Sequence, residues 1–236
     1  MPLAVNSARS FESRAQGGWW LSGWASSRVV AGVTDRHTES TQLLGALPRV
    51  LASVQAEQVH GASLAMVERR QALPRPLPGC DALLTAVPGV ALLIRTADCL
   101  PIFLTDPARG VVALLHAGWR GLAASLPARA VSAFQHGYQS RAAELSVAIG
   151  PAIRACCYEV GPEFDEPFGS YVQLRNGRRT CDLVGYAIAQ LRQCGVRPDR
   201  ILDTQRCTAC EPQQWFSLRR EGPSTGRLTS VIMLRP

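Results

Sequence analysis

Lysine is absent from this sequence: all 25 basic side chains are arginine, set against 18 acidic ones. The resulting formal net charge of +7 would, by itself, suggest a nucleic-acid partner. The arginines are spread along the chain, however, and no basic run alternates with aromatic residues as in a single-strand binder. We therefore expect no nucleic-acid partner.

Long apolar runs are also missing. No stretch of about 18 apolar residues occurs, so no transmembrane helix is expected. The N-terminus has no charged segment followed by an apolar stretch, so we expect no signal peptide. These absences predict a cytoplasmic protein without a membrane partner. In that reducing compartment, the eight cysteines should be free thiols or metal ligands rather than disulfides.

The apolar content of 47% in 236 residues is sufficient for a large core, and no repeat or linker divides the chain, so residues 1–236 are expected to form one domain. Short runs rich in Val, Ile or Leu and bounded by Gly, Pro or Asp predict buried strands. The predicted strands are Arg28–Thr34, Ala62–Val67, Val90–Ile94, Pro101–Thr105, Val111–His116, Leu145–Ile149 and Arg227–Leu234.

Two segments predict helices. One follows Gly118 and runs to about His136, with Gly137 as its stop; the other begins after Asp182, a good N-cap, and ends at Gly195. Strands interleaved with few helices predict an α/β fold with mixed sheets flanked by helices, although this pattern does not fix the order of the strands.

Histidine is scarce, and two of the four histidines, His60 and His116, lie at the ends of predicted strands beside glycine. With Cys99, His60 and His116 would supply the two imidazoles and one thiolate that catalytic zinc accepts together with water. Their separations of 39 and then 17 residues match no known finger spacing, so two hydrogen-bonded histidines and a small buried thiol remain an alternative. His37 and His136 are expected to face solvent.

Six short motifs follow one another along residues 45–236. They are Gln58-Val-His-Gly61, Thr96-Ala-Asp-Cys-Leu-Pro101, His116-Ala-Gly-Trp-Arg-Gly121, Ile149-Gly-Pro151 with Cys157-Tyr-Glu-Val160, Cys207-Thr-Ala-Cys210, and Phe216-Ser-Leu-Arg-Arg220 with Gly226-Arg227. This ordered set resembles the YfiH-like family, also named for polyphenol oxidase or laccase activity and for peptidoglycan editing.

The resemblance implies a layered α/β sandwich similar to the CNF toxin deamidases. It also implies that His60, Cys99 and His116 form the catalytic centre and bind one metal ion, mostly zinc, with copper as an alternative. The implied activity is phosphorolysis of adenosine, inosine and methylthioadenosine, with adenosine deamination and minor oxidation of phenols. The expected partners are therefore a purine nucleoside and phosphate.

Three residues beside the expected ligands are further candidates. Asp98 would orient a ligand histidine or accept a proton, or else cap the turn that follows it. Arg120 would bind phosphate or nucleoside through paired hydrogen bonds, with a solvated surface position as the alternative. Trp119 would stack on a base or pack in the core.

Residues 1–45 look shortened and divergent. The family resemblance implies an Arg-x-Gly-Gly segment and an Asn-Leu-Gly segment bordering the pocket, but Arg36 is followed by His37-Thr-Glu-Ser40. Arg36 is the candidate for the arginine of the first segment, and we expect it to bind substrate.

Other functions remain open. Cys99 and His116 alone would suit a metal-free thiol hydrolase or amidase. A single copper on the same three residues would support weak phenol oxidation, since a multicopper site needs about ten histidines. An inactive metal-binding scaffold is the non-enzymatic alternative.

The remaining cysteines include a doublet, Cys156-Cys157, and a Cys-x-x-Cys pair, Cys207 and Cys210. A second, structural zinc built from these four is conceivable. One such pair without a second spaced pair is a weak signal, so the sequence favours reduced, packed thiols.

Overall fold

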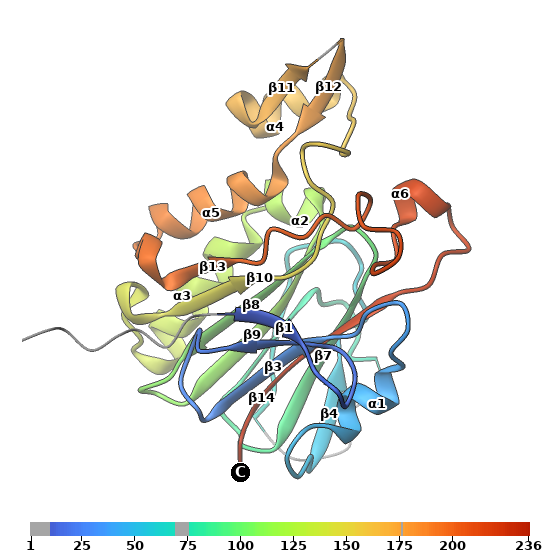
Figure 1. Ribbon diagram of the computed structural model, residues 1–236. Helices are drawn as coiled ribbons and strands as arrows, with labels where there is room; N and C mark the ends of the chain where they lie inside the picture. Colours follow the sequence, from blue (N-terminus) through green and yellow to red (C-terminus); the bar gives the residue numbers. More distant parts are fainter. Residues whose placement is uncertain (1–9, 69–75, 176) are drawn as a thin grey trace, which may run out of the picture.

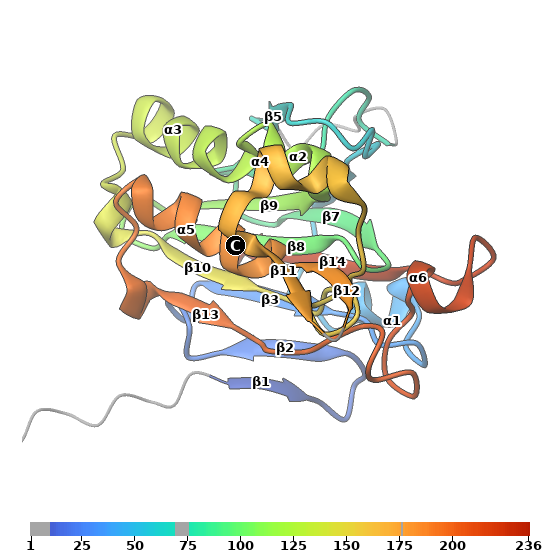
Figure 2. The same cartoon turned by 90° about the horizontal axis from the view of Figure 1, so that it is seen from above.

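The computed structural model describes residues 10–68, 76–175 and 177–236. Its body is two six-stranded mixed sheets packed face to face (Figures 1 and 2). The first sheet runs in the order β1 (Ser10–Ser13), β2 (Trp19–Ser22), β3 (Val29–Val33), β14 (Leu228–Leu234), β7 (Val90–Thr96), β4 (Ala52–Gln55). The second runs β13 (Ile201–Asp203), β10 (Ser146–Ile149), β8 (Leu100–Asp106), β9 (Val111–Ala117), β6 (Ala82–Thr85), β5 (Leu64–Met66).

The central strands are buried on both faces, and the alternation of their side chains shows why. On β9, Val112 and Leu114 join the core between the two sheets, whereas Val111, Ala113 and Leu115 join the core under the helices. Because successive residues of a strand point to opposite faces, a strand covered on both sides must be apolar throughout.

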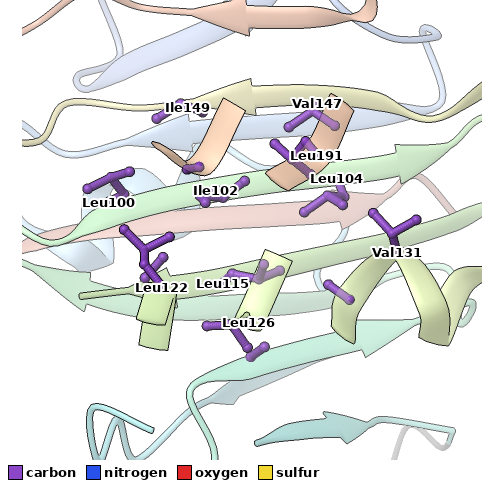
Figure 3. Packing of buried hydrophobic residues seen from close by; sticks show 14 of the residues in the cluster. Leu100, Ile102, Leu104, Leu115, Leu122, Leu126, Val131, Val147, Ile149 and Leu191 are labelled. Carbon is purple, nitrogen blue, oxygen red and sulfur yellow. The ribbon is translucent and has the colours of Figure 1, made fainter. Parts of the chain in front are cut away.

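Helices cover both outer faces of this pair of sheets. The second sheet is covered by α2 (Trp119–Ala123), α3 (Leu126–Tyr138) and α5 (Leu183–Gln193). Figure 3 shows Leu122, Val131 and Leu191 of these helices among the side chains of β8, β9 and β10. The first sheet is covered by α1 (Ser40–Gly45), whose Leu43 packs in a smaller cluster with Trp20. The layered α/β fold expected from the sequence is therefore confirmed.

A small hairpin, β11 (Val172–Arg175) with β12 (Arg178–Cys181), stands away from the two sheets beside α4 (Asp165–Phe168), at the top of Figure 1. The helix α6 (Leu218–Glu221) lies in the segment leading to β14. Among the described residues, single 3₁₀ turns occur at Ala142–Glu144, Pro162–Phe164, Gly169–Tyr171 and Pro198–Arg200. Within the described ranges, no helix has the length and apolar character needed to span a bilayer.

All seven predicted strands are present, as β3, β5, β7, β8, β9, β10 and β14, within two residues at each end. The helix after Asp182 is also confirmed: the Asp182 carboxylate accepts the N–H of Gly185 at 2.9 Å, and Gly195 follows the helix with φ +94°. The strands β1, β2, β4, β6, β11, β12 and β13 were not predicted.

The single helix predicted from Gly118 to His136 is wrong in two respects. The chain breaks at Ser125, whose φ of +60° no α-helix accommodates, so two helices form. The second helix continues through Gly137 to Tyr138, and the next residue, Gln139, adopts the left-handed conformation that was expected of Gly137. Pro127, in the first turn of α3, was the available signal of a new helix start.

Candidate functional site

The three residues singled out by the motifs come together near the ends of central strands of the two sheets. His60 lies in the loop after β4, and Cys99 lies in the turn by which the chain passes from β7 of the first sheet to β8 of the second. His116 is on β9, opposite Pro101 of β8. One donor atom from each of the three lies within 4.8 Å of the others. Tertiary structure thus assembles an N, S, N donor set that chain spacing alone does not suggest.

A buried carboxylate holds two parts of this centre. Asp81 precedes β6 and is fully buried; its Oδ1 lies 2.9 Å from Nδ1 of His116. The same carboxylate accepts the backbone N–H groups of His60 at 2.8 Å and of Gly61 at 2.7 Å. Because Asp81 holds Nδ1 of His116, the other ring nitrogen, Nε2, is left to face Cys99. A carboxylate on one ring nitrogen commonly orients a histidine that binds a metal through the other.

Asp81 was missed at the level of sequence, although one signal was present. It is the only charged residue in the apolar run from Cys80 to Val90. A charged group next to a buried strand needs a partner, because an unpaired buried charge is very costly.

Two glycines of the motif from His116 to Gly121 are required by close packing. A Cβ atom on Gly118 would lie 3.1 Å from Sγ of Cys99, and one on Gly121 would lie 2.8 Å from the carbonyl oxygen of Gly61. Both helix α2 and the loop of His60 can therefore approach the centre only because these positions lack a side chain.

The electrostatics of the centre favour an ionised thiol. Burial alone would raise the pKa of Cys99, but hydrogen bonds with His116 and His60 outweigh it and lower the pKa to about 7. Burial opposes protonation of His116, but Asp81 and Cys99 raise its pKa to about 9. Although burial would raise the pKa of Asp81, its bonds to His116 and to the backbone of Gly61 lower it. Without a metal, both shifts favour the thiolate–imidazolium form of the Cys99–His116 pair.

A cavity of about 400 Å³ opens beside this centre, with His60 and Cys99 in its wall and the buried His116 behind them. Its walls combine the aromatic rings of Trp119 and Tyr158 with two exposed arginines, and its volume lies in the range typical of small-molecule sites. It is lined by His60, Ala97, Asp98, Cys99, Gly118, Trp119, Arg120, Ile153, Tyr158, Leu183, Leu218 and Arg219.

Each of the two arginines lies over one of the rings. The Cζ atom of Arg120 is 4.3 Å from the ring centroid of Trp119, and that of Arg219 is 4.9 Å from the ring centroid of Tyr158. Arg219 was not singled out from the sequence. Its neighbour Arg220 instead binds the carbonyl oxygens of Thr208, Ala209 and Trp215, so only one residue of the doublet faces the cavity.

Asp98 lines the cavity, but both of its carboxylate oxygens are engaged away from the histidines. Oδ1 accepts the hydroxyl of Thr208 at 2.6 Å, and Oδ2 accepts the backbone N–H of Arg219 at 2.7 Å. Asp98 thus ties the C-terminal segment to the turn of Cys99. The sequence had suggested that Asp98 orients a ligand histidine, but Asp81 makes that contact, with His116.

Arg36 lies in a different place from the other candidates. Its guanidinium binds the carbonyl of Pro212 and the carboxylate of Glu221, and its Cζ is 5.0 Å from the ring centroid of Phe216. It lines a separate cavity of about 630 Å³ with Arg95 and others. The structure therefore does not bring Arg36 to the cavity of His60, Cys99 and His116.

The other two histidines are exposed, as expected. Nε2 of His37 is 2.8 Å from the carbonyl oxygen of Gln213, and Nδ1 of His136 contacts Ser132 of its own helix. Only two of the four histidines therefore contribute to the centre, too few for a multicopper cluster.

The fold and this centre define a class: layered α/β proteins with a His–Cys–His donor set where the two sheets meet. The family described as multi-copper polyphenol oxidoreductase laccase matches residues 16–235. The chain belongs to this family, the YfiH-like family. The match begins upstream of the motif-bearing residues 45–236.

Named relatives and solved structures agree with this assignment. The chain is 36% identical over 194 residues to "Purine nucleoside phosphorylase YlmD" of Geobacillus stearothermophilus, covering 75% of this chain and 70% of that protein. It is 35% identical to "Adenosine deaminase RL5" of an unknown prokaryotic organism, covering 76% and 74%. The crystal structure of YlmD superposes with a TM-score of 0.85 at 30% identity, covering 97% of this chain and 100% of that one.

Proposed function

We propose that this protein is a zinc-dependent purine nucleoside enzyme that catalyses phosphorolysis of adenosine, inosine or methylthioadenosine and deamination of adenosine. The observation that carries the proposal is the convergence of His60, Cys99 and His116 beside an open cavity. The names of the relatives, purine nucleoside phosphorylase and adenosine deaminase, support the substrate class.

The donor chemistry suits zinc. One thiolate and two imidazoles are borderline ligands, and three protein ligands with one open side are typical of catalytic zinc. Asp81 fixes the ring of His116, and the low pKa of Cys99 makes its thiolate available near neutral pH. When bound, zinc supplies Lewis-acid activation of water or of a substrate group. Copper on the same donors is the alternative metal.

The cavity suits a nucleoside and an anion together. Trp119 and Tyr158 give the cavity an aromatic wall against which a purine ring would pack. Arg120 and Arg219 place two fixed positive charges at the same cavity, and a guanidinium binds phosphate through two parallel hydrogen bonds. These side chains would bind and orient the nucleoside and the attacking phosphate beside His60 and Cys99.

The test is a panel of purine nucleosides assayed with and without phosphate, for the wild type and Arg120→Ala. Losing hydrogen bonds to a charged group costs about 1.5–3 kcal/mol, so Arg120→Ala should slow phosphorolysis about ten- to a hundredfold. Deamination needs no phosphate and should be slowed less. Equal losses in both reactions would assign Arg120 to the nucleoside, and no loss in either would return it to the solvated surface.

A metal-free Cys–His hydrolase is the second candidate, and one observation favours it. Asp81, His116 and Cys99 form a chain of contacts like that of a thiol hydrolase, with a lowered thiol pKa. The third converging residue, His60, is explained better by a metal. Elemental analysis of protein purified without added ions separates the two candidates.

Two weaker alternatives predict different outcomes, which phenol oxidation assays and the nucleoside panel would distinguish. A single copper on His60, Cys99 and His116 would give phenol oxidation that depends on added copper. An inactive scaffold would retain its metal but turn over no nucleoside in the panel.

A further inference from the structure

A second cluster of potential ligands lies outside the proposed catalytic centre. Cys156 and Cys157 are in the loop after β10, and Cys207 and Cys210 follow β13. Although about fifty residues separate the two pairs, the four sulfur atoms all lie within 4.8 Å of one another. All four cysteines are free.

The spacing of the sulfur atoms matches a tetrahedral metal site. The Sγ–Sγ distances are 3.7 Å for Cys156–Cys207, 3.4 Å for Cys156–Cys210 and 3.3 Å for Cys157–Cys210. Four thiolates at about 2.3 Å from zinc would be about 3.8 Å apart. A disulfide needs about 2.05 Å, and each sulfur could form only one. A single ion at the centre accounts for the position of all four.

The backbone holds the two loops in this relation independently of the sulfurs. Thr208 N–H donates to the carbonyl of Ala152 at 3.1 Å, and Ala152 N–H donates to that of Arg206 at 3.3 Å.

We propose that Cys156, Cys157, Cys207 and Cys210 bind one zinc ion as a closed, structural site. An all-sulfur set selects a soft or borderline metal such as zinc, and four protein ligands leave no position for substrate. This proposal does not depend on the proposed function.

The cluster lies where it would stiffen the wall of the cavity. Tyr158, which lines the cavity, directly follows Cys157, and Thr208, beside Cys207, donates to the carboxylate of Asp98. Zinc would therefore cross-link two loops that reach the cavity from different parts of the chain. Loss of the ion should make the two loops in the cavity wall more mobile, although every side chain that lines the cavity would still be present.

The experiment is elemental analysis of the untagged, reduced protein, refolded with zinc and then desalted. The wild type should hold about two zinc ions per chain, one for each donor group. Cys156→Ser and Cys210→Ser, which change exposed thiols, should each hold about one less. Cys194→Ser, which changes a half-buried thiol outside both groups, is the matched control and should keep both ions.

A spectroscopic measurement keeps the test valid if a cysteine variant folds poorly. In Cys99→Ala, which retains the cluster, X-ray absorption should show zinc with sulfur neighbours alone at about 2.3 Å. If Cys156→Ser and Cys210→Ser hold as much zinc as the wild type, the proposal is overturned. A disulfide between any two of the four in the native protein, found by mass spectrometry, would also overturn it. If the four cysteines bind no zinc, the proposal for the centre at Cys99 still stands, because Cys99→Ala reports the zinc of that centre separately.

Discussion

Cysteine sulfur occurs in two contrasting surroundings in this protein. One is the centre of His60, Cys99 and His116, and the other is the cluster of four cysteines. At the centre, two imidazoles lower the pKa of one thiol to about 7, and a 400 Å³ cavity lies open beside it. In the cluster, burial and other thiols raise the pKa of Cys156 to about 11. An open, mixed donor set suits chemistry, whereas a closed set of four sulfurs suits cross-linking. Three changes test this contrast.

Removing the thiol of the centre should have the largest effect. Cys99→Ala loses a charged ligand, so turnover of purine nucleosides should fall more than about 100-fold and the zinc of the centre should be lost. Zinc in the four-cysteine cluster should remain. Kinetics and elemental analysis of the same preparation measure both, with Cys194→Ser as the control. Full zinc content with no activity would instead identify Cys99 as a nucleophile.

Removing the charge behind His116 should have an intermediate effect. Asp81→Asn keeps the size of the side chain but loses the carboxylate that holds Nδ1 of His116. The zinc affinity of the centre should fall about 10- to 100-fold, as is typical for such partners. Competition with a chromophoric chelator measures this affinity.

Asp106→Asn is the matched control for that variant. Asp106 is also buried and also accepts two backbone N–H groups, from Ala108 and Arg109, but it lies at the far end of β8 from Cys99. Asp106→Asn should lower the free energy of unfolding while leaving the zinc affinity of the centre unchanged. Equal losses of affinity in both variants would mean that Asp81 acts only through general stability.

The pH dependence of thiol reactivity should show the smallest of the three effects. A lowered pKa means that Cys99 is a thiolate above about pH 7 and a thiol below it. In zinc-free protein, its alkylation rate should therefore rise about tenfold from about pH 6 to about pH 8 and then level off. Burial raises the pKa of Cys181 to about 12, so this thiol should stay unreactive over that range. A Cys99 midpoint near that of an ordinary thiol would show that the two histidines do not act on it.

The sequence predicted strands where a run of apolar residues is long and uninterrupted. Val111–Ala117 is such a run, because it is buried on both faces. The strands Val172–Arg175 and Arg178–Cys181 are largely polar and give no such run. Ala82–Thr85 is fully buried but was not predicted. The break at Ser125 was missed because the apolar periodicity continues on both sides of it.

The motifs at His60, Cys99 and His116 could be recognised before the fold was known, because each keeps a short local pattern beside glycine or proline. The order of the strands, the pairing of Asp81 with His116, the division of roles between Arg219 and Arg220, and the meeting of Cys156–Cys157 with Cys207–Cys210 could not. Each depends on contacts between residues far apart in the chain, which only the packing of two sheets and their loops creates. The sequence determined which side chains were available for chemistry, and tertiary structure decided which of them share a site.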